Sequence, residues 1–220
     1  MIDAIIITVK LAGVTTVALM LLCTPLAWWL ARGQSGWLRN CVEAAIALPL
    51  ILPPTVMGFY LLLLLSPEGL FGQFFDRGLA FSFTGLVIGS CVYSLPFVAQ
   101  PLTASFRQLD PQLIQLGQSQ GLNRFAVFRH IILPCCGYAF VAAAALGFAH
   151  TVGEFGVILM IGGNIPGETQ VLSVLLYDEV ESLQYANAHR LAGGLVVVSW
   201  VILFMLYRWQ RGRGGFHVGA

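Results

Sequence analysis

The residue types that usually carry out chemistry are few in this chain, and their spacing excludes several kinds of site. The only lysine, Lys10, has no glycine-rich loop before it, so the chain holds no P-loop for nucleotide phosphates. The five cysteines and four histidines show neither a C-x-x-C pair nor the spacing of metal ligands. We therefore predict no catalytic residues, no metal site and no bound cofactor.

Glu154, in the stretch "TVGEFG", is the one carboxylate deep inside a long apolar segment. Ionisable residues within membrane spans are costly and usually mark a functional position. The alternative is an acid at a helix end or a dimer interface, satisfied by neighbouring backbone donors. An ion-coupled carrier would need more intramembrane acids than this single one, so that class of transporter is disfavoured.

The elements that must position these residues are those of a membrane protein. Of 220 residues, 58% are hydrophobic and only 10% are charged, whereas about a quarter of the residues of a soluble domain are charged. Long unbroken apolar runs favour helices over the alternating pattern of a β-barrel. We predict an all-α integral membrane protein with one transmembrane domain over residues 1–220.

Five segments have about the 20 apolar residues that a membrane-crossing helix needs. Prolines lie within the first three of them, and Gly153, Glu154 and Gly156 are expected to end or bend the fourth. The predicted spans are 8–31, 44–65, 83–106, 135–160 and 191–207.

The basic residues predict the orientation of these spans. Eight arginines follow the first, third and fifth spans, and only Lys10, Arg77 and Arg190 lie on the other side. An excess of basic residues marks the cytoplasmic side. We therefore expect the N-terminus outside and the C-terminus in the cytoplasm. The eight arginines are Arg32, Arg39, Arg107, Arg124, Arg129, Arg208, Arg211 and Arg213.

The cytoplasmic loop 107–134 is predicted to fold into two short helices. Asp110 before Pro111 is typical of a helix start, and Gly121 of a helix end. Asn123 can cap a second helix with an apolar face. Both ends are tethered to the membrane and no third helix packs on the pair, which disfavours a DNA-binding helix-turn-helix; no nucleic acid partner is expected. The expected apolar face consists of Phe125, Phe128 and Ile132.

Two further segments are candidates for the translocation pathway. Pro53 and Pro54 open an apolar segment and could expose backbone groups of a broken helix, although a packing kink would give the same pattern. The polar stretch "GGNIPGETQ" (162–170) could contact a partner or a gate, or could simply connect two spans. With the "TVGEFG" break, the candidates are Pro53, Pro54, Glu154, Gly156, Gly162, Gly163 and Asn164.

One stretch of the cytoplasmic loop, "QLGQSQGLNRFAVFRHIILP", carries a resemblance. Nine residues separate Gly121 from Ile131, and Leu133-Pro134 follows. This spacing resembles the G-x9-I-x-L-P half of the EAA signature of binding-protein-dependent ABC permeases. Where that family has Glu-Ala-Ala, this chain has another triplet. The departing residues are Gln115, Leu116 and Gly117.

Three other stretches resemble the ModB-type molybdate permeases of type I importers. They are "LPLILPPTVMGFYLLLLL" (48–65), "FTGLVIGSCVYSLPFVAQPL" (83–102) and "GEFGVILMIGGNIPGETQVLSVLLYDEV" (153–180), and the resemblance covers nearly the whole chain. Sulfate and thiosulfate permeases are the nearest relatives and are usually longer. Tungstate remains open as a substrate, and an ion-coupled carrier is the alternative from another class.

The resemblance implies a fold of the MetI-like permease type and a set of partners. These are a second copy of this chain, two cytoplasmic ABC ATPase subunits and an external oxyanion-binding protein. The helix over 110–121 would be the coupling helix, seated in a groove of an ATPase that hydrolyses the ATP. The residues expected to couple to the ATPase are Gln115, Leu116, Gly117, Gly121, Arg124, Phe125, Ile131, Leu133 and Pro134.

Overall fold

The structure, a computed structural model, describes residues 1–33, 36–75 and 78–213. Arg77 and the tail after residue 213 lie outside this part. The described residues form helices joined by turns, and no strand occurs among them, which confirms the all-α prediction. The α-helices are α1 Ile2–Arg32, α2 Trp37–Ala47, α3 Pro54–Leu65, α4 Phe83–Gln108, α5 Pro111–Ser119, α6 Arg124–Val127, α7 Leu133–Cys135, α8 Gly137–Gly153, α9 Gly156–Gly162, α10 Leu172–Glu181 and α11 Tyr185–Arg213. Short 3₁₀ turns cover Leu48–Leu50 and Gly72–Phe74, and a π-helical turn covers Phe128–Ile132.

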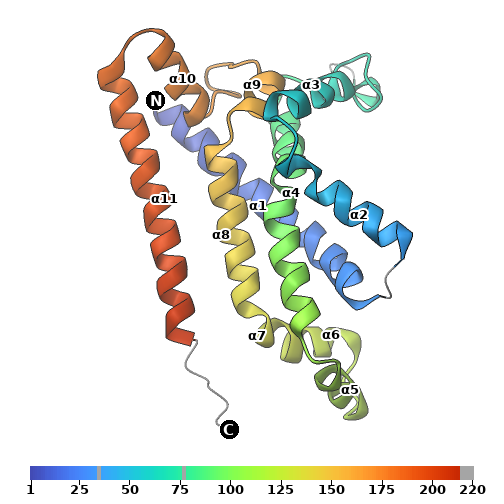
Figure 1. The fold of residues 1–220 in the computed structure, drawn as a ribbon. Coiled ribbons are helices and arrows are strands. Elements are labelled where there is room, and N and C mark those ends of the chain that lie inside the picture. The colour runs from blue at the N-terminus through green and yellow to red at the C-terminus, as the bar shows by residue number, and fades with distance from the viewer. Residues whose placement is uncertain (34–35, 76–77, 214–220) are drawn as a thin grey trace.

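Helices α1, α4 and α8 pack side by side along most of their lengths and form the centre of the molecule (Figure 1). α1 and α4 run without a break through Pro25, Pro96 and Pro101, so these prolines do not end the spans in which they lie. α11 packs against α8 and α10 and leaves a long apolar face exposed, as a helix facing lipid would.

The core has two parts, one toward each end of the bundle. At the end that carries α5 and α6 (Figure 1), side chains of α1, α4 and α8 surround Phe106, whose ring meets Trp28 edge-on at 5.4 Å. At the other end, Leu11 and Leu86 pack against residues of α9 such as Ile158. Small residues permit the close contacts there, since a Cβ on Gly89 would lie 2.2 Å from the Ile161 side chain.

Among the described residues, three helices have the length and composition to cross a membrane, or up to five if each sharply bent pair counts as one span. The three are Ile2–Arg32, Phe83–Gln108 and Tyr185–Arg208, which contain the predicted first, third and fifth spans and exceed them in length.

The predicted second and fourth spans are each divided between helices. Residues 44–65 divide between α2 and α3, which meet at 112° around Pro53, whose backbone is extended because Pro54 follows it. Residues 135–160 divide at both ends: the segment up to Cys135 meets α8 at 76°, and α8 ends before Glu154. The bend or end expected at "TVGEFG" is therefore confirmed.

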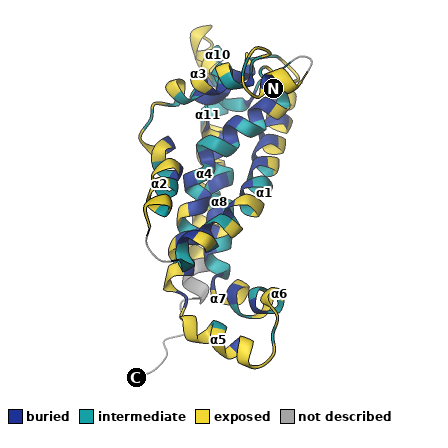
Figure 2. Cartoon of the chain, turned by 90° about the vertical axis from the view of Figure 1, so that its right-hand side faces the viewer, coloured by how far each residue is buried: buried dark blue, intermediate teal, exposed yellow. Residues whose placement is uncertain are grey.

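Different helices form the two ends of the molecule. The N-terminus, α3, α9 and α10 lie at one end, and α5, α6 and α7 lie at the other with the end of α11 (Figure 1). α10 is a helix that the sequence did not predict, within what was expected to be an outer loop. Figure 2 shows that α5 and α2 are largely exposed, whereas α4 and α8 are mostly buried or intermediate.

Candidate functional site

The loop between α4 and α8 has the capped turn that its sequence predicts. The Asp110 side chain accepts a hydrogen bond from the backbone N–H of Gln112 at 2.8 Å, with Pro111 as the first helical residue. α5 ends at Gln120, and Gly121 follows with φ +84°, a conformation that favours glycine. The Asn123 side chain accepts from the backbone N–H of Ala126 at 2.8 Å and caps α6. Local hydrogen bonds therefore set the shape of this loop.

Gly117 explains how α5 can lie on the segment after it. A Cβ at this position would lie 2.4 Å from Cδ1 of Ile131, so glycine permits a close approach that a larger residue would prevent. Its neighbours in the departing triplet, Gln115 and Leu116, point outward, and Leu116 keeps 59% of its surface exposed. The triplet therefore has one residue packed inward and two open to a partner.

The predicted apolar face of the second short helix is wrong. Phe125 is 71% exposed, Phe128 is half-buried and Ile132 is only 4% exposed, so the three do not share an environment. The π-helical turn Phe128–Ile132 contributes for Ile132, because its wider turn rotates later residues away from their α-helical positions. Leu133 and Pro134 open α7 and are exposed.

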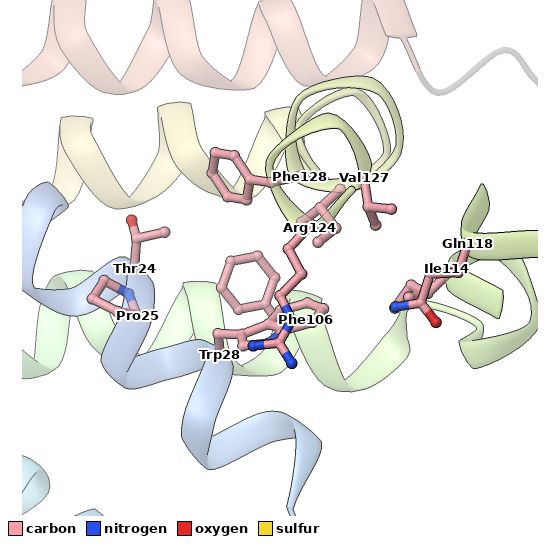
Figure 3. A pocket seen from close by; sticks show the side chains of 10 residues that line it. Thr24, Pro25, Trp28, Phe106, Ile114, Gln118, Arg124, Val127 and Phe128 are labelled. Carbon is pink, nitrogen blue, oxygen red and sulfur yellow. The ribbon is translucent and has the colours of Figure 1, made fainter. Parts of the chain in front are cut away.

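Arg124 borders a pocket between this loop and the membrane-spanning helices. Its side chain reaches back from α6 toward Trp28 and Phe106 (Figure 3). The pocket has a volume of about 410 Å³ and is mostly apolar, with Ile114 and Phe128 on the loop side. The loop is also tied to α1, because Nη2 of Arg32 donates to the carbonyl of Leu109 at 2.8 Å. Movement of the loop would therefore act directly on α1 and α4.

A second candidate region lies at the break between α8 and α9. Pro54, Glu154 and Gly156 line one cavity of about 490 Å³, together with parts of α4 and α8. Gly156 is required by the packing here, because its Cβ would lie 2.7 Å from Cβ of Pro54. Pro53 lies just before α3 and is exposed. Three of the predicted pathway residues are thus brought together from distant parts of the sequence.

Glu154 is 3% exposed, and neither of its carboxylate oxygens has a hydrogen-bond partner among the described residues. Its backbone carbonyl accepts a bond from the Ser173 hydroxyl. The expected alternative, an acid satisfied by backbone donors, is therefore wrong for its side chain. The Ser90 hydroxyl lies beside the carboxyl group and is free to donate a hydrogen bond to it, because it bonds to no other group of the described structure.

Sequence reasoning missed several polar residues of this cavity. Tyr93, His150 and Thr55 line it, although His150 was expected to be an ordinary core or surface histidine. The signal that could have found it is spacing, because His150 and Glu154 are four residues apart and a helix places such residues on one face.

The other predicted pathway residues lie in a turn of their own. Gly163 and Asn164 both have positive φ, at +66° and +53°, and end α9. The Asn164 side chain donates to Asp178 at 2.8 Å, and Gln170 bonds to both. Gly162 is buried, and its carbonyl accepts from the Thr169 hydroxyl at 2.6 Å. This turn is closed by its own hydrogen bonds and does not line the cavity at Glu154.

With this geometry established, comparisons with known proteins indicate the family. Residues 23–211 match the model of a family described as "Binding-protein-dependent transport system inner membrane component". The chain is 48% identical to the molybdenum transport system permease protein ModB of Azotobacter vinelandii, over 96% of this chain and 95% of that one. It is 31% identical to the sulfate transport system permease protein CysT of Salmonella typhimurium, over 88% and 71% of the two chains.

A solved structure has the same fold. It is described as a bacterial ABC transporter involved in the import of the acidic polysaccharide alginate, and it matches 97% of this chain and 79% of its own with a TM-score of 0.76 at 20% identity. At that identity the likeness concerns the fold, and it agrees with the MetI-like permease fold expected from the sequence. The chain therefore belongs to the family of binding-protein-dependent transport system inner membrane components.

Proposed function

We propose that this protein is the membrane-spanning permease subunit of an ATP-driven, binding-protein-dependent molybdate importer. The observation that carries the proposal is the 48% identity to a molybdenum permease over nearly the full length of both chains. The weaker likeness to a sulfate permease, 31% over a longer protein, makes sulfate the second candidate substrate. Molybdate and sulfate are both tetrahedral dianions, so one pathway could pass either.

The energy for transport comes from a partner subunit in this proposal. The chain has no P-loop lysine, so two ABC ATPase subunits would hydrolyse ATP beneath a dimer of this chain. The α5–α6 loop would be their docking element, with α5 as the coupling helix. Its exposed Gln115, Leu116 and Phe125 support contact with a partner. Closing of the ATPase dimer would then move α1 through the hydrogen bond from Arg32 to Leu109, and α4 through its direct connection to the loop.

The proposed orientation places the N-terminus outside and the α5–α6 loop in the cytoplasm. The first halves of α1 and α11, which contain Lys10 and Arg190, lie toward the end that carries the N-terminus, whereas α5 and α6 lie toward the opposite end (Figure 1). The basic residues of this loop region are Arg107, Arg124 and Arg129. An external oxyanion-binding protein would deliver the substrate to the end formed by α3, α9 and α10. A single transmembrane domain over 1–220, as the sequence predicts, is part of this proposal.

Reconstitution in liposomes with the neighbouring ATPase and binding protein tests the function. We expect uptake of labelled molybdate that requires ATP, both partners and this chain, and that excess sulfate competes with weakly. Uptake that persists without the ATPase or without ATP would overturn the ABC assignment. Equal competition by sulfate would instead favour the second candidate substrate.

A further inference from the structure

Helix α11 leaves an open groove between itself and the rest of the helical bundle. The groove has a volume of about 650 Å³ and lies between the first half of α11 and helices α1, α8 and α10. α11 stands at one edge of the molecule (Figure 1), and only 6% of its most apolar stretch is buried. Helices in a membrane are held together by close packing, and an open groove forfeits those contacts. An apolar molecule from the bilayer would restore them.

The walls of the groove have the shape and chemistry that suit an acyl chain. Ile5 and Val9 of α1 and Val198 of α11 line it and are exposed, so the groove is open along its side. Gly194 of α11 adds room, because nothing lies within 4 Å of a Cβ built there. Between Arg190 and Val198 the helix rises about 12 Å, at 1.5 Å per residue. The groove therefore runs lengthwise into the apolar part of α11.

The mouth of the groove is polar and lies where α11 enters the hydrocarbon. Arg190 is the last charged residue before an apolar run that ends at Arg208. Arg190 forms no ion pair or hydrogen bond with the described residues. Glu179 of α10 also lines the groove, and its Oε2 accepts from Nδ2 of Asn187 at 3.2 Å, while its Oε1 has no such bond in the described structure. The mouth thus offers a cation and an acceptor that are not paired with each other.

We propose that this groove binds one phospholipid whose headgroup carries a primary ammonium, phosphatidylethanolamine, with an acyl chain lying between α1 and α11. The guanidinium of Arg190 matches the geometry of the lipid phosphate. The ammonium donates to the free carboxylate oxygen of Glu179. A choline headgroup has no N–H to donate, and an anionic headgroup lacks the positive charge that Glu179 would pair with. This lipid is separate from the transported ion, and it fastens α11 to the bundle.

A second copy of this chain is the other molecule that could cover the groove. An apolar helix of that copy would fill the walls, but it would leave the charges of Arg190 and Glu179 at the mouth unpaired. A zwitterionic phospholipid brings charges of both signs to the level of the headgroups and an apolar chain to the depth of the walls. The charges at the mouth therefore favour the lipid.

Two neighbouring glycines provide a matched test of the groove. Gly194→Phe would fill it, whereas Gly193→Phe is the control, because Gly193 does not line the groove and nothing lies within 4 Å of its Cβ either. The full-length chain is purified in a mild detergent, and native mass spectrometry counts the phosphatidylethanolamine retained per chain. We expect wild type and Gly193→Phe to retain one molecule and Gly194→Phe to lose most of it.

Equal lipid retention by the two glycine variants would overturn the proposal. Conversion of dimers to monomers by Gly194→Phe, with unchanged lipid content, would also overturn it and would assign the groove to a second copy. The unfolding temperatures of the two variants without lipid should be similar, since neither side chain meets a neighbour.

Thermal unfolding of delipidated protein tests the headgroup. Phosphatidylethanolamine should raise the unfolding temperature more than phosphatidylcholine or phosphatidylglycerol with the same chains, and more than glycerophosphoethanolamine, which has none. Arg190→Gln should weaken the apparent affinity about tenfold, because it removes a charge-assisted bond to phosphate. Glu179→Gln should reduce the preference over phosphatidylcholine. Equal effects of the ethanolamine and choline lipids, equal effects of the chainless headgroup, or unchanged affinity in Arg190→Gln would each contradict the proposed lipid site.

Discussion

The α5–α6 loop and the α8–α9 break differ in how their polar and apolar side chains are placed. In the loop, polar side chains such as Asp110 and Asn123 satisfy backbone N–H groups, and apolar Leu116 and Phe125 are left exposed. At the break, apolar residues pack tightly and the polar groups of Glu154 and Ser90 are buried beside each other. The first region is complete in shape but has an uncovered surface, which is typical of a docking site for protein. The second region instead keeps polar groups inside the helical bundle, closed off from solvent.

The largest expected effect that tests this contrast is at Gly117. Valine there would overlap Ile131, because even a Cβ would lie 2.4 Å from its Cδ1, and would push α5 off the segment behind it. We expect ATP-dependent uptake to fall more than tenfold, since misplacing a docking element by about 1 Å can cost a hundredfold. Molybdate uptake in liposomes measures this loss, and copurification of the ATPase measures whether docking is impaired. Gln112→Val, at an exposed position of the same helix, is the control; equal losses in both variants would argue against a role for the close approach.

Substitution of Gly156 should lower the stability of the α8–α9 break through its packing, without affecting docking of the ATPase. A side chain there would meet Pro54, whose ring cannot move aside, and overpacking of this kind costs about 1–3 kcal/mol. We expect Gly156→Val to lower the unfolding temperature in detergent while the ATPase still copurifies. Gly153→Val is the matched control, since nothing lies within 4 Å of its Cβ. Similar unfolding temperatures for the two variants would contradict this account of the α3–α9 contact.

Substitution of Gly121 should have a smaller effect, which comes from backbone strain and not from a steric clash. Its φ is +84°, yet nothing lies within 4 Å of a Cβ built there, so a substitution meets strain without a clash. A β-branched residue in this conformation costs roughly 1–2 kcal/mol. Gly121→Val should therefore weaken coupling of ATP hydrolysis to uptake and leave membrane insertion intact. Asparagine tolerates the left-handed region better, so Gly121→Asn should recover most of the coupling; if it does not, the strain explanation is wrong.

The smallest expected effect is at the ion pair between Arg107 and Glu43. The two side chains are 50% and 38% exposed, and exposed pairs contribute about 0–1 kcal/mol. Glu43→Gln should change the unfolding temperature and the uptake rate only slightly. A large loss in uptake would mean that α2 takes part in coupling, and the docking region would then extend beyond the α5–α6 loop.

Local signals in the sequence predicted the loop more accurately than the spans. The caps at Asp110 and Asn123 and the turn at Gly121 depend on residues within a few positions of one another, so the sequence was sufficient for them. The sequence left a broken helix and a packing kink open at Pro53 and Pro54, and the structure shows a 112° bend there. A proline weakens a helix without deciding whether it kinks or turns, because neighbouring helices settle that choice. α1 and α4 illustrate the other outcome, since they run through their prolines.

At the cavity near Glu154, too, the sequence predicted single residues but not how they come together. Glu154 and Gly156 were recognisable because a carboxylate and paired glycines are rare in an apolar run. The sequence did not predict that they line one cavity with Pro54 of α3 and Tyr93 of α4. These residues are about 60 to 100 positions apart, and only the packing of the helices brings them together.

By itself, the sequence determined the all-helical membrane class and the capped α5–α6 turn. These follow from composition and from contacts between near neighbours, which any packing of the helices would preserve. Only the tertiary structure decided that Glu154 is buried beside Ser90 and that Gly117 packs against Ile131 while Leu116 does not. Burial depends on which helices meet, and that is a property of the whole bundle rather than of any one segment.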